Sequence, residues 1–120
     1  MAERVAFAGY CTDRDALYAN VDILVQPSRR ESMSHSVIEA MARGIPCVVT
    51  DVGGLPETVL DGTTGFVVPD GQPPACADAL SRLLTERETF ARFSRAGRER
   101  VRTFFDLRRV MLETVKTILG

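Results

Sequence analysis

The sequence predicts an α/β fold built on a parallel sheet, and three observations carry that prediction. Apolar runs of strand length occupy residues 23–25 and 46–50. An alanine-rich helical segment at residues 37–43 lies between them and stops at Gly44. Strand, helix and strand in this order form a βαβ unit, whose strands are parallel and joined by a right-handed crossover. Ligands of open parallel sheets bind at the carboxyl ends of strands, which is where the polar loop 28–36 falls.

The remaining elements are marked by turn residues and by periodicity. Thr12, with Asp15 three residues on, is typical of a capping box that starts a helix. Pro56 stands early in a short helix, where its missing N–H is harmless. Besides the βαβ unit we therefore expect, in chain order, a strand at 5–8, a helix at 13–20, a short helix at 55–60, a strand at 65–68 and a helix at 75–84.

Two helices complete the predicted chain. Residues 86–103 are highly charged, yet their apolar residues recur at helical spacing. Asp106 is placed to cap a final helix, whose apolar stripe follows one side from Leu107 to Leu119. Glutamates are interleaved with the arginines here, which favours a solvated helix face. The alternative is contact with nucleic acid or an anionic membrane through Arg92, Arg95, Arg98, Arg100 and Arg102.

Length and composition indicate one small domain of 120 residues. We divide it into a sheet part, residues 1–85, and the C-terminal helices of the same domain, residues 86–120. Basic and acidic residues number 15 and 16, so we expect no nucleic-acid partner. No membrane span or signal peptide is visible in the sequence. Cys11, Cys47 and Cys76 lack metal-ligand spacing and are interpreted as reduced thiols of a cytoplasmic protein without a metal site.

Three blocks of sequence carry a resemblance to a known family. Residues 27–46 contain PS-x-x-E and then EAMA-x-G-x-P, residues 50–57 match T-D-x-GG-x-P-E, and residues 61–69 are DGTTGFVVP. Together they resemble the nucleotide-sugar-binding half of the retaining glycosyltransferases of the two-Rossmann-domain class, family four. The resemblance covers most of the chain. It implies a three-layer Rossmann-like parallel sheet, truncated because it lacks the first strands of the domain, with C-terminal helices.

The family signature is a pair of glutamates separated by seven residues, which Glu31 and Glu39 match. By resemblance, Glu31 is the catalytic residue beside the donor sugar, where it binds sugar hydroxyls and helps to stabilise positive charge at the anomeric carbon. Glu39 by resemblance binds the ribose, because a carboxylate can accept from two neighbouring hydroxyls. From the residues alone, Ser36 and Glu39 fit a capping box. Glu31 alone fits a solvated side chain near a helix N-terminus.

A short segment is assigned to the donor sugar and diphosphate, because free N–H groups at a helix N-terminus favour anions. Its residues are Ser32, Met33, Ser34, His35, Ser36 and Val37. The family more often has glycine and an apolar residue after its first glutamate, so the identity of the sugar stays open. His35 is either a donor to phosphate or sugar, or a surface histidine. Tyr10 and Cys11 border the base by resemblance, and a Tyr10 packed on the sheet is the alternative.

The expected function is therefore that of the C-terminal donor-binding part of a glycosyltransferase. The parent moves a sugar from a nucleoside-diphosphate sugar to an acceptor hydroxyl with retention, using no cofactor besides that donor. We expect an acceptor-binding N-terminal domain and a basic Gly-Arg…Lys segment upstream, so this chain alone should not transfer sugar. A non-catalytic nucleotide-binding or interaction module of the same fold stays open, as does peripheral membrane contact of the parent. The EAMA-x-G-x-P block argues against a nucleotide-sugar epimerase.

The resemblance also implies how the strands are ordered. In a sheet ordered 3-2-1-4-5-6, residues 5–8, 23–26, 46–50 and 65–68 correspond to the third to sixth strands. Without the first two strands, the strand at 23–26 has an open edge, and exposed edges recruit partners. We expect either that residues 5–8 move in beside 23–26, or that two chains associate as a homodimer or by exchanging strands.

Overall fold

The core of the protein is a parallel sheet of three strands. A computed structural model describes residues 2–31 and 34–119. Strands β1 (Leu24–Gln26), β2 (Cys47–Thr50) and β3 (Gly65–Val68) lie in the order β1-β2-β3, and both pairs are parallel. The predicted α/β class, and the predicted adjacency of 23–26, 46–50 and 65–68, are confirmed.

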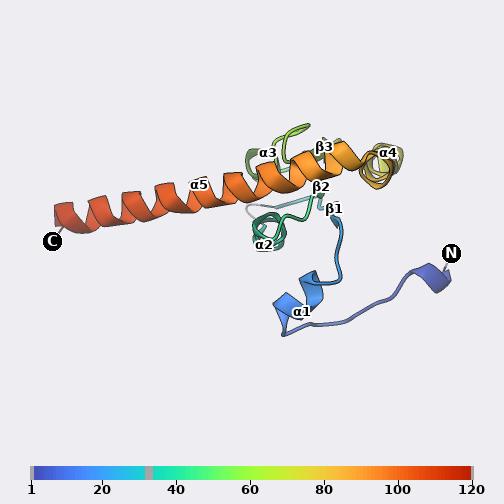
Figure 1. Cartoon of the computed structure of the whole chain (residues 1–120), viewed down its shortest axis with the longest axis horizontal. Helices are drawn as coiled ribbons and strands as arrows, with labels where there is room; N and C mark the ends of the chain where they lie inside the picture. The colour runs from blue at the N-terminus through green and yellow to red at the C-terminus, as the bar shows by residue number, and fades with distance from the viewer. Residues whose placement is uncertain (1, 32–33, 120) are drawn as a thin grey trace.

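Five α-helices surround this sheet in the described part of the chain (Figure 1). They are α1 (Arg14–Tyr18), α2 (His35–Ala42), α3 (Leu55–Thr58), α4 (Pro73–Thr85) and α5 (Arg87–Leu119). A single 3₁₀ turn, Ala2–Arg4, precedes them.

The three layers follow from the alternation of side chains along β2. All four residues of β2 are buried, because helices cover both faces of the sheet. Cys47 and Val49 join a cluster with α2 and α3, whereas Val48 joins a second cluster with β3, α4 and the start of α5. In the second cluster the rings of Phe66 and Phe93 meet edge to face at 5.0 Å, a favourable arrangement of aromatic rings.

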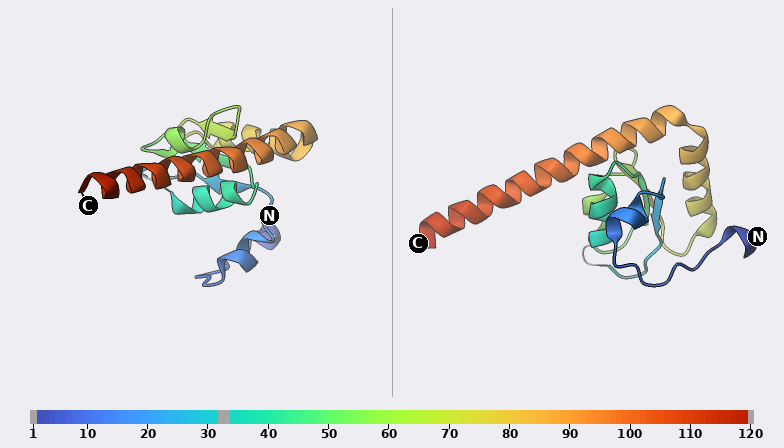
Figure 2. Two further views of the ribbon diagram at one scale, coloured as in Figure 1. Left: turned by 60° about the vertical axis from the view of Figure 1, so that its left-hand side comes forward. Right: turned by 60° about the horizontal axis from the view of Figure 1, so that its bottom comes forward.

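Helix α5 contributes to both clusters because it contacts α4 on one face of the sheet and α2 on the other (Figure 2). Phe93 is buried in one cluster and Val101 in the other. Between them, Gly97 lies over Met41 of α2, where an added Cβ would sit 3.8 Å from the Met41 side chain. This distance is an ordinary van der Waals contact, so α5 packs directly on α2 at this point.

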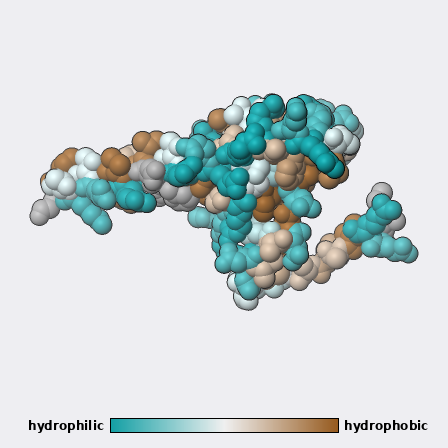
Figure 3. Space-filling view, viewed as in Figure 1, coloured by the Kyte–Doolittle hydropathy of each residue, from teal (hydrophilic) through white to brown (hydrophobic). Residues whose placement is uncertain are grey.

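The C-terminal end of α5 extends away from the body of the protein (Figure 2). Figure 3 shows brown, hydrophobic surface on this projecting end. The exposed apolar residues there are Leu107, Val110, Met111, Leu112, Val115, Ile118 and Leu119. Within the described residues, no helix is both long and apolar enough to cross a membrane.

Residues 5–8 do not form the predicted strand. Phe7 is 98% exposed, and the segment leads away from the sheet (Figure 1). A strand needs a neighbouring strand to bond its backbone N–H and C=O groups, and none of β1, β2 and β3 pairs with residues 5–8. The predicted move of 5–8 to the edge of β1 is therefore wrong, so β1 has β2 as its partner within the described chain. Association of two chains through this edge stays a prediction.

Two predicted caps are also wrong. Asp13, not Thr12, caps α1, since its side chain accepts a hydrogen bond from Ala16 N at 3.1 Å. Asp106 starts no new helix, because α5 continues through it as one helix of 33 residues. An aspartate inside a helix costs only about 0.7 kcal/mol relative to alanine, less than interrupting the run of backbone hydrogen bonds.

We predict that Cys47 makes stability fall at alkaline pH. Burial raises the pKa of the Cys47 thiol from 9.0 to about 12. Above pH 9 the unfolded chain loses this proton and the folded chain keeps it, so the free energy of unfolding drops by about 1.4 kcal/mol per pH unit until the pH approaches 12. Urea unfolding at a series of pH values measures the slope. If Cys47→Ala loses stability equally fast with rising pH, the Cys47 thiol is not the cause of the loss.

Candidate functional site

The carboxyl end of β1 carries a hydrogen-bonded group of polar side chains. Gln26 Nε2 donates to Oε2 of Glu31 at 2.9 Å, and Ser28 Oγ donates to the same oxygen at 3.5 Å. At its other end, the Gln26 amide oxygen accepts from Ser34 Oγ at 2.8 Å. Glu31 is half-buried, and its carboxylate is held directly beyond the last residue of the strand.

Helix α2 begins beside this carboxylate. Ser34 is its N-cap, with Oγ accepting from Val37 N at 3.2 Å, so the predicted capping box of Ser36 with Glu39 is wrong. The sequence favoured Ser36 over Ser34 because a glutamate follows Ser36 after three residues, whereas a valine follows Ser34. The N–H groups of His35 and Ser36, in the first turn, have no partner within the helix.

The six residues assigned to the donor therefore differ in whether their polar groups are free to bind a ligand. Val37 is fully buried and its N–H is already bonded to Ser34, so it stabilises the start of the helix. His35 and Ser36 have exposed side chains. Ser32 and Met33 lie outside the described residues.

The turn after β2 holds the backbone of Glu31. Gly54 N donates to the Glu31 carbonyl oxygen at 3.1 Å. Gly53 has φ +53°, and a Cβ on it would lie 1.5 Å from that same oxygen. Without a side chain at Gly53, the turn can approach the backbone of Glu31 closely.

Glu39 forms an ion pair with Arg14 of α1. Arg43, the C-cap of α2, pairs with Asp15 of α1, and its guanidinium lies 4.7 Å from the ring centroid of Tyr18. These contacts join α1 to α2. Burial raises the pKa of Tyr18, and its hydroxyl donates a hydrogen bond to the backbone oxygen of Ser36 at 3.3 Å.

The predicted base-binding pair lies in the N-terminal segment before α1. Tyr10 is 92% exposed, so the alternative in which it packs on the sheet is wrong. Cys11 is half-buried. A hollow of about 390 Å³ opens at the carboxyl ends of the strands, lined by Pro27 after β1, Thr50 of β2 and Pro69 after β3. Within residues 2–31 and 34–119, no group of three or more His, Cys, Asp or Glu side chains could hold a metal ion.

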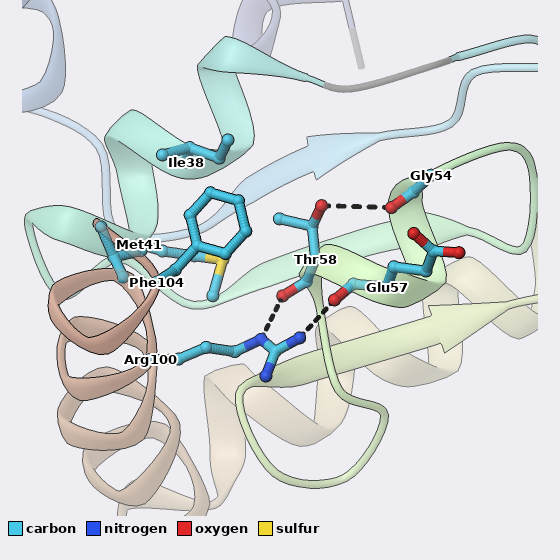
Figure 4. Close-up of a pocket in the computed structure, with 8 residues that line it drawn as sticks. Ile38, Met41, Gly54, Glu57, Thr58, Arg100 and Phe104 are labelled. Carbon is cyan, nitrogen blue, oxygen red and sulfur yellow. Dashed lines mark hydrogen bonds between the residues drawn. The ribbon is translucent and has the colours of Figure 1, made fainter. Parts of the chain in front are cut away.

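A cavity of about 220 Å³ between α2, α3 and α5 shows a contact that the sequence did not reveal (Figure 4). Arg100 Nε donates to Thr58 O at 2.9 Å, and Arg100 Nη2 donates to Glu57 O. The guanidinium thus satisfies carbonyls at the C-terminal end of α3, where a cation is favourable. Sequence reasoning placed Arg100 on a solvated face, because no local pattern marks contact with a residue 42 positions away.

Comparisons with known proteins agree with this arrangement. A family model described as "Glycosyl transferases group 1" matches residues 1–100. The D-inositol 3-phosphate glycosyltransferase of Corynebacterium glutamicum (strain R) is 43% identical over 89 residues, which are 74% of this chain and 21% of that protein.

Two solved structures extend the likeness to the fold. Sucrose-phosphate synthase (tll1590) from Thermosynechococcus elongatus is 34% identical with a TM-score of 0.84, covering 97% of this chain and 30% of that one. Anabaena Alr3699/HepE, solved in complex with UDP-glucose, is 25% identical with a TM-score of 0.85, covering 96% of this chain and 32% of that one. The chain thus spans between 21% and 32% of the length of these three proteins.

We predict that Gly53→Ala destabilises the protein more than the same change at Gly62. Both glycines have positive φ, which costs alanine roughly 1–2 kcal/mol. At Gly62 an added Cβ meets no atom within 4 Å, whereas at Gly53 it meets Glu31 O. Urea unfolding of both variants measures the difference, and NMR should show displaced signals for Glu31 only in Gly53→Ala. Equal losses of stability would contradict the close approach.

We also predict that Arg100→Leu lowers the free energy of unfolding by about 1–3 kcal/mol, because the α3 carbonyls lose a charged donor. Arg95→Leu is the matched control on the same helix; Arg95 is exposed, and its loss should change stability by less than about 0.5 kcal/mol. Amide hydrogen exchange at Gly54 should accelerate in the first variant. Indistinguishable exchange rates in the two variants would argue that Arg100 does not brace α3.

Proposed function

This chain belongs to the group 1 glycosyl transferases, and on that premise we propose that it is the donor-binding part of an enzyme that moves a sugar from a nucleoside-diphosphate sugar to an acceptor hydroxyl with retention. The observation that carries the proposal is the carboxylate of Glu31, held at the carboxyl end of β1 by Gln26 and Ser28. The acceptor side of the reaction belongs to the whole protein, because this chain spans about a fifth of its curated relative.

Glu31 is the proposed catalytic residue. The hydrogen bonds from Gln26 and Ser28 fall on Oε2, so in this role Oε1 accepts from a hydroxyl of the donor sugar. A fixed negative charge beside the anomeric carbon stabilises the positive charge that develops there as the bond to the diphosphate breaks. The surrounding bonds matter because a carboxylate already in place needs no reorganisation during the reaction.

The diphosphate is proposed to bind at the start of α2. The first-turn N–H groups of His35 and Ser36 and the helix dipole favour an anion by about 0.3–1 kcal/mol at an exposed site. Ser34 serves this site indirectly, as the cap that fixes where the helix begins. The assigned segment also includes Ser32 and Met33, which follow Glu31 in the sequence.

Glu39 is proposed to bind the ribose, with Tyr10 and Cys11 at the base. The ion pair with Arg14 falls on Oε1 of Glu39, and 63% of the Arg14 side chain is exposed. Exposed ion pairs contribute about 0–1 kcal/mol, so a ribose diol can share or replace this contact at little cost. Likewise Tyr10, with 92% of its surface exposed, is accessible to a nucleobase.

The proposal predicts how the chain responds to UDP and UDP-glucose, the probes bound by its structural neighbour. NMR shifts should appear at His35, Ser36 and Glu39. Glu31→Gln should weaken UDP-glucose binding about tenfold or more without changing UDP binding, because it removes a charged acceptor from the sugar alone. Glu39→Gln should weaken both ligands.

Glu113→Gln is the matched control, because Glu113 is exposed on the projecting end of α5. Shifts confined to other parts of the chain would refute the proposed site. If the whole protein with Glu31→Gln still transfers sugar, Glu31 is not the catalytic residue, and only the nucleotide-binding part of the proposal remains.

A further inference from the structure

One side chain connects the proposed catalytic carboxylate to the helix that is proposed to hold the diphosphate. Gln26 donates from Nε2 to Glu31 at 2.9 Å and accepts at Oε1 from Ser34 at 2.8 Å. Ser34 Oγ in turn accepts from Val37 N at 3.2 Å. We propose that Gln26 is a positioning residue that sets the distance between the Glu31 carboxylate and the start of α2; this inference rests on the proposed function.

The orientation of the Gln26 amide is fixed by its neighbours at both ends. An ionised carboxylate only accepts hydrogen bonds, so Glu31 requires the NH₂ group. The hydroxyl of Ser34 already accepts from Val37 N, so its proton is available to the amide oxygen. Both requirements select the same orientation. The hydrogen bonds therefore run in one direction, from the α2 backbone through Ser34 and Gln26 to Glu31, and members of such a chain strengthen one another.

The backbone of Gln26 gives this connection a rigid base. Gln26 is the last residue of β1, and its Cα is paired with that of Val49 in the buried central strand. Ser34 is only 4% exposed. Because binding groups must be held within about 0.5 Å of their productive geometry, a side chain anchored in the sheet suits this role better than one in a loop.

Two substitutions separate the two ends of the amide. Gln26→Leu is of similar size and removes both hydrogen bonds. Gln26→Glu keeps an oxygen that accepts from Ser34 but places a second carboxylate against Glu31, so only that end is broken. In the free protein, the ¹³C signal of the Glu31 carboxyl should shift in both variants, whereas the amide signal of Val37 should shift only in Gln26→Leu.

Binding by calorimetry gives the functional readout. UDP-glucose should bind about tenfold more weakly to both variants, equivalent to about 1.4 kcal/mol, whereas UDP should bind within about twofold of the unchanged chain. A residue with only a structural role would leave Gln26→Glu, with its helix cap intact, at full affinity. If Gln26→Leu does not fold, the affinity of Gln26→Glu for UDP-glucose is by itself sufficient to test the proposal.

The outcomes distinguish this inference from the function on which it rests. If Glu31→Gln weakens UDP-glucose binding and neither Gln26 variant does, the positioning role is refuted and the proposed function stands. If the unchanged chain and Glu31→Gln bind UDP-glucose equally, the proposed function is refuted, and the role of Gln26 with it. Weaker binding of UDP-glucose by all three variants, with UDP unaffected, supports both.

Discussion

Burial of β2 on both faces is the constraint on which the rest of the structure depends. Cys47 and Val49 point to one helical layer and Val48 to the other, and all three have no exposed surface. Because β2 lies between the other two strands, its position fixes where β1 and β3 end. The polar groups of Gln26 and Thr50 thereby come to one edge of the sheet, which is where parallel sheets bind ligands.

The proposed catalytic residue is held through its side chain by residues close to it in sequence, and through its backbone by a turn further along the chain. Gln26 and Ser28 bond its carboxylate from β1 and the loop that follows. Gly54 bonds its backbone oxygen from the turn after β2. Behind that turn, Arg100 of α5 caps α3. The C-terminal helix thus bonds the short helix α3, which begins at the turn that contacts Glu31.

The first two helices contact each other through both apolar and charged side chains. The contact of α1 with α2 combines the buried side chain of Tyr18 with two ion pairs that are partly open to water, Arg14 with Glu39 and Arg43 with Asp15. Such ion pairs are individually weak, so the burial of Tyr18 contributes much of the contact. A ribose site built on Glu39 would therefore use a residue whose present partner is easily replaced.

Sequence alone determined the periodic elements and the chemistry they carry. The apolar runs and the turn residues predicted the three parallel strands that form, and a fourth at residues 5–8 that does not, because hydrophobic period and turn residues are local properties. Tertiary structure decided what depends on neighbours. Residues 5–8 have strand composition but no strand to pair with, Ser34 rather than Ser36 caps α2, and Asp106 stays inside a helix. The roles of Gly53 and Arg100 arise only when the folded chain brings distant segments into contact, and no local pattern encodes those contacts. Gln26 is close to Glu31 and Ser34 in sequence, but its amide bonds both of them only in the folded chain.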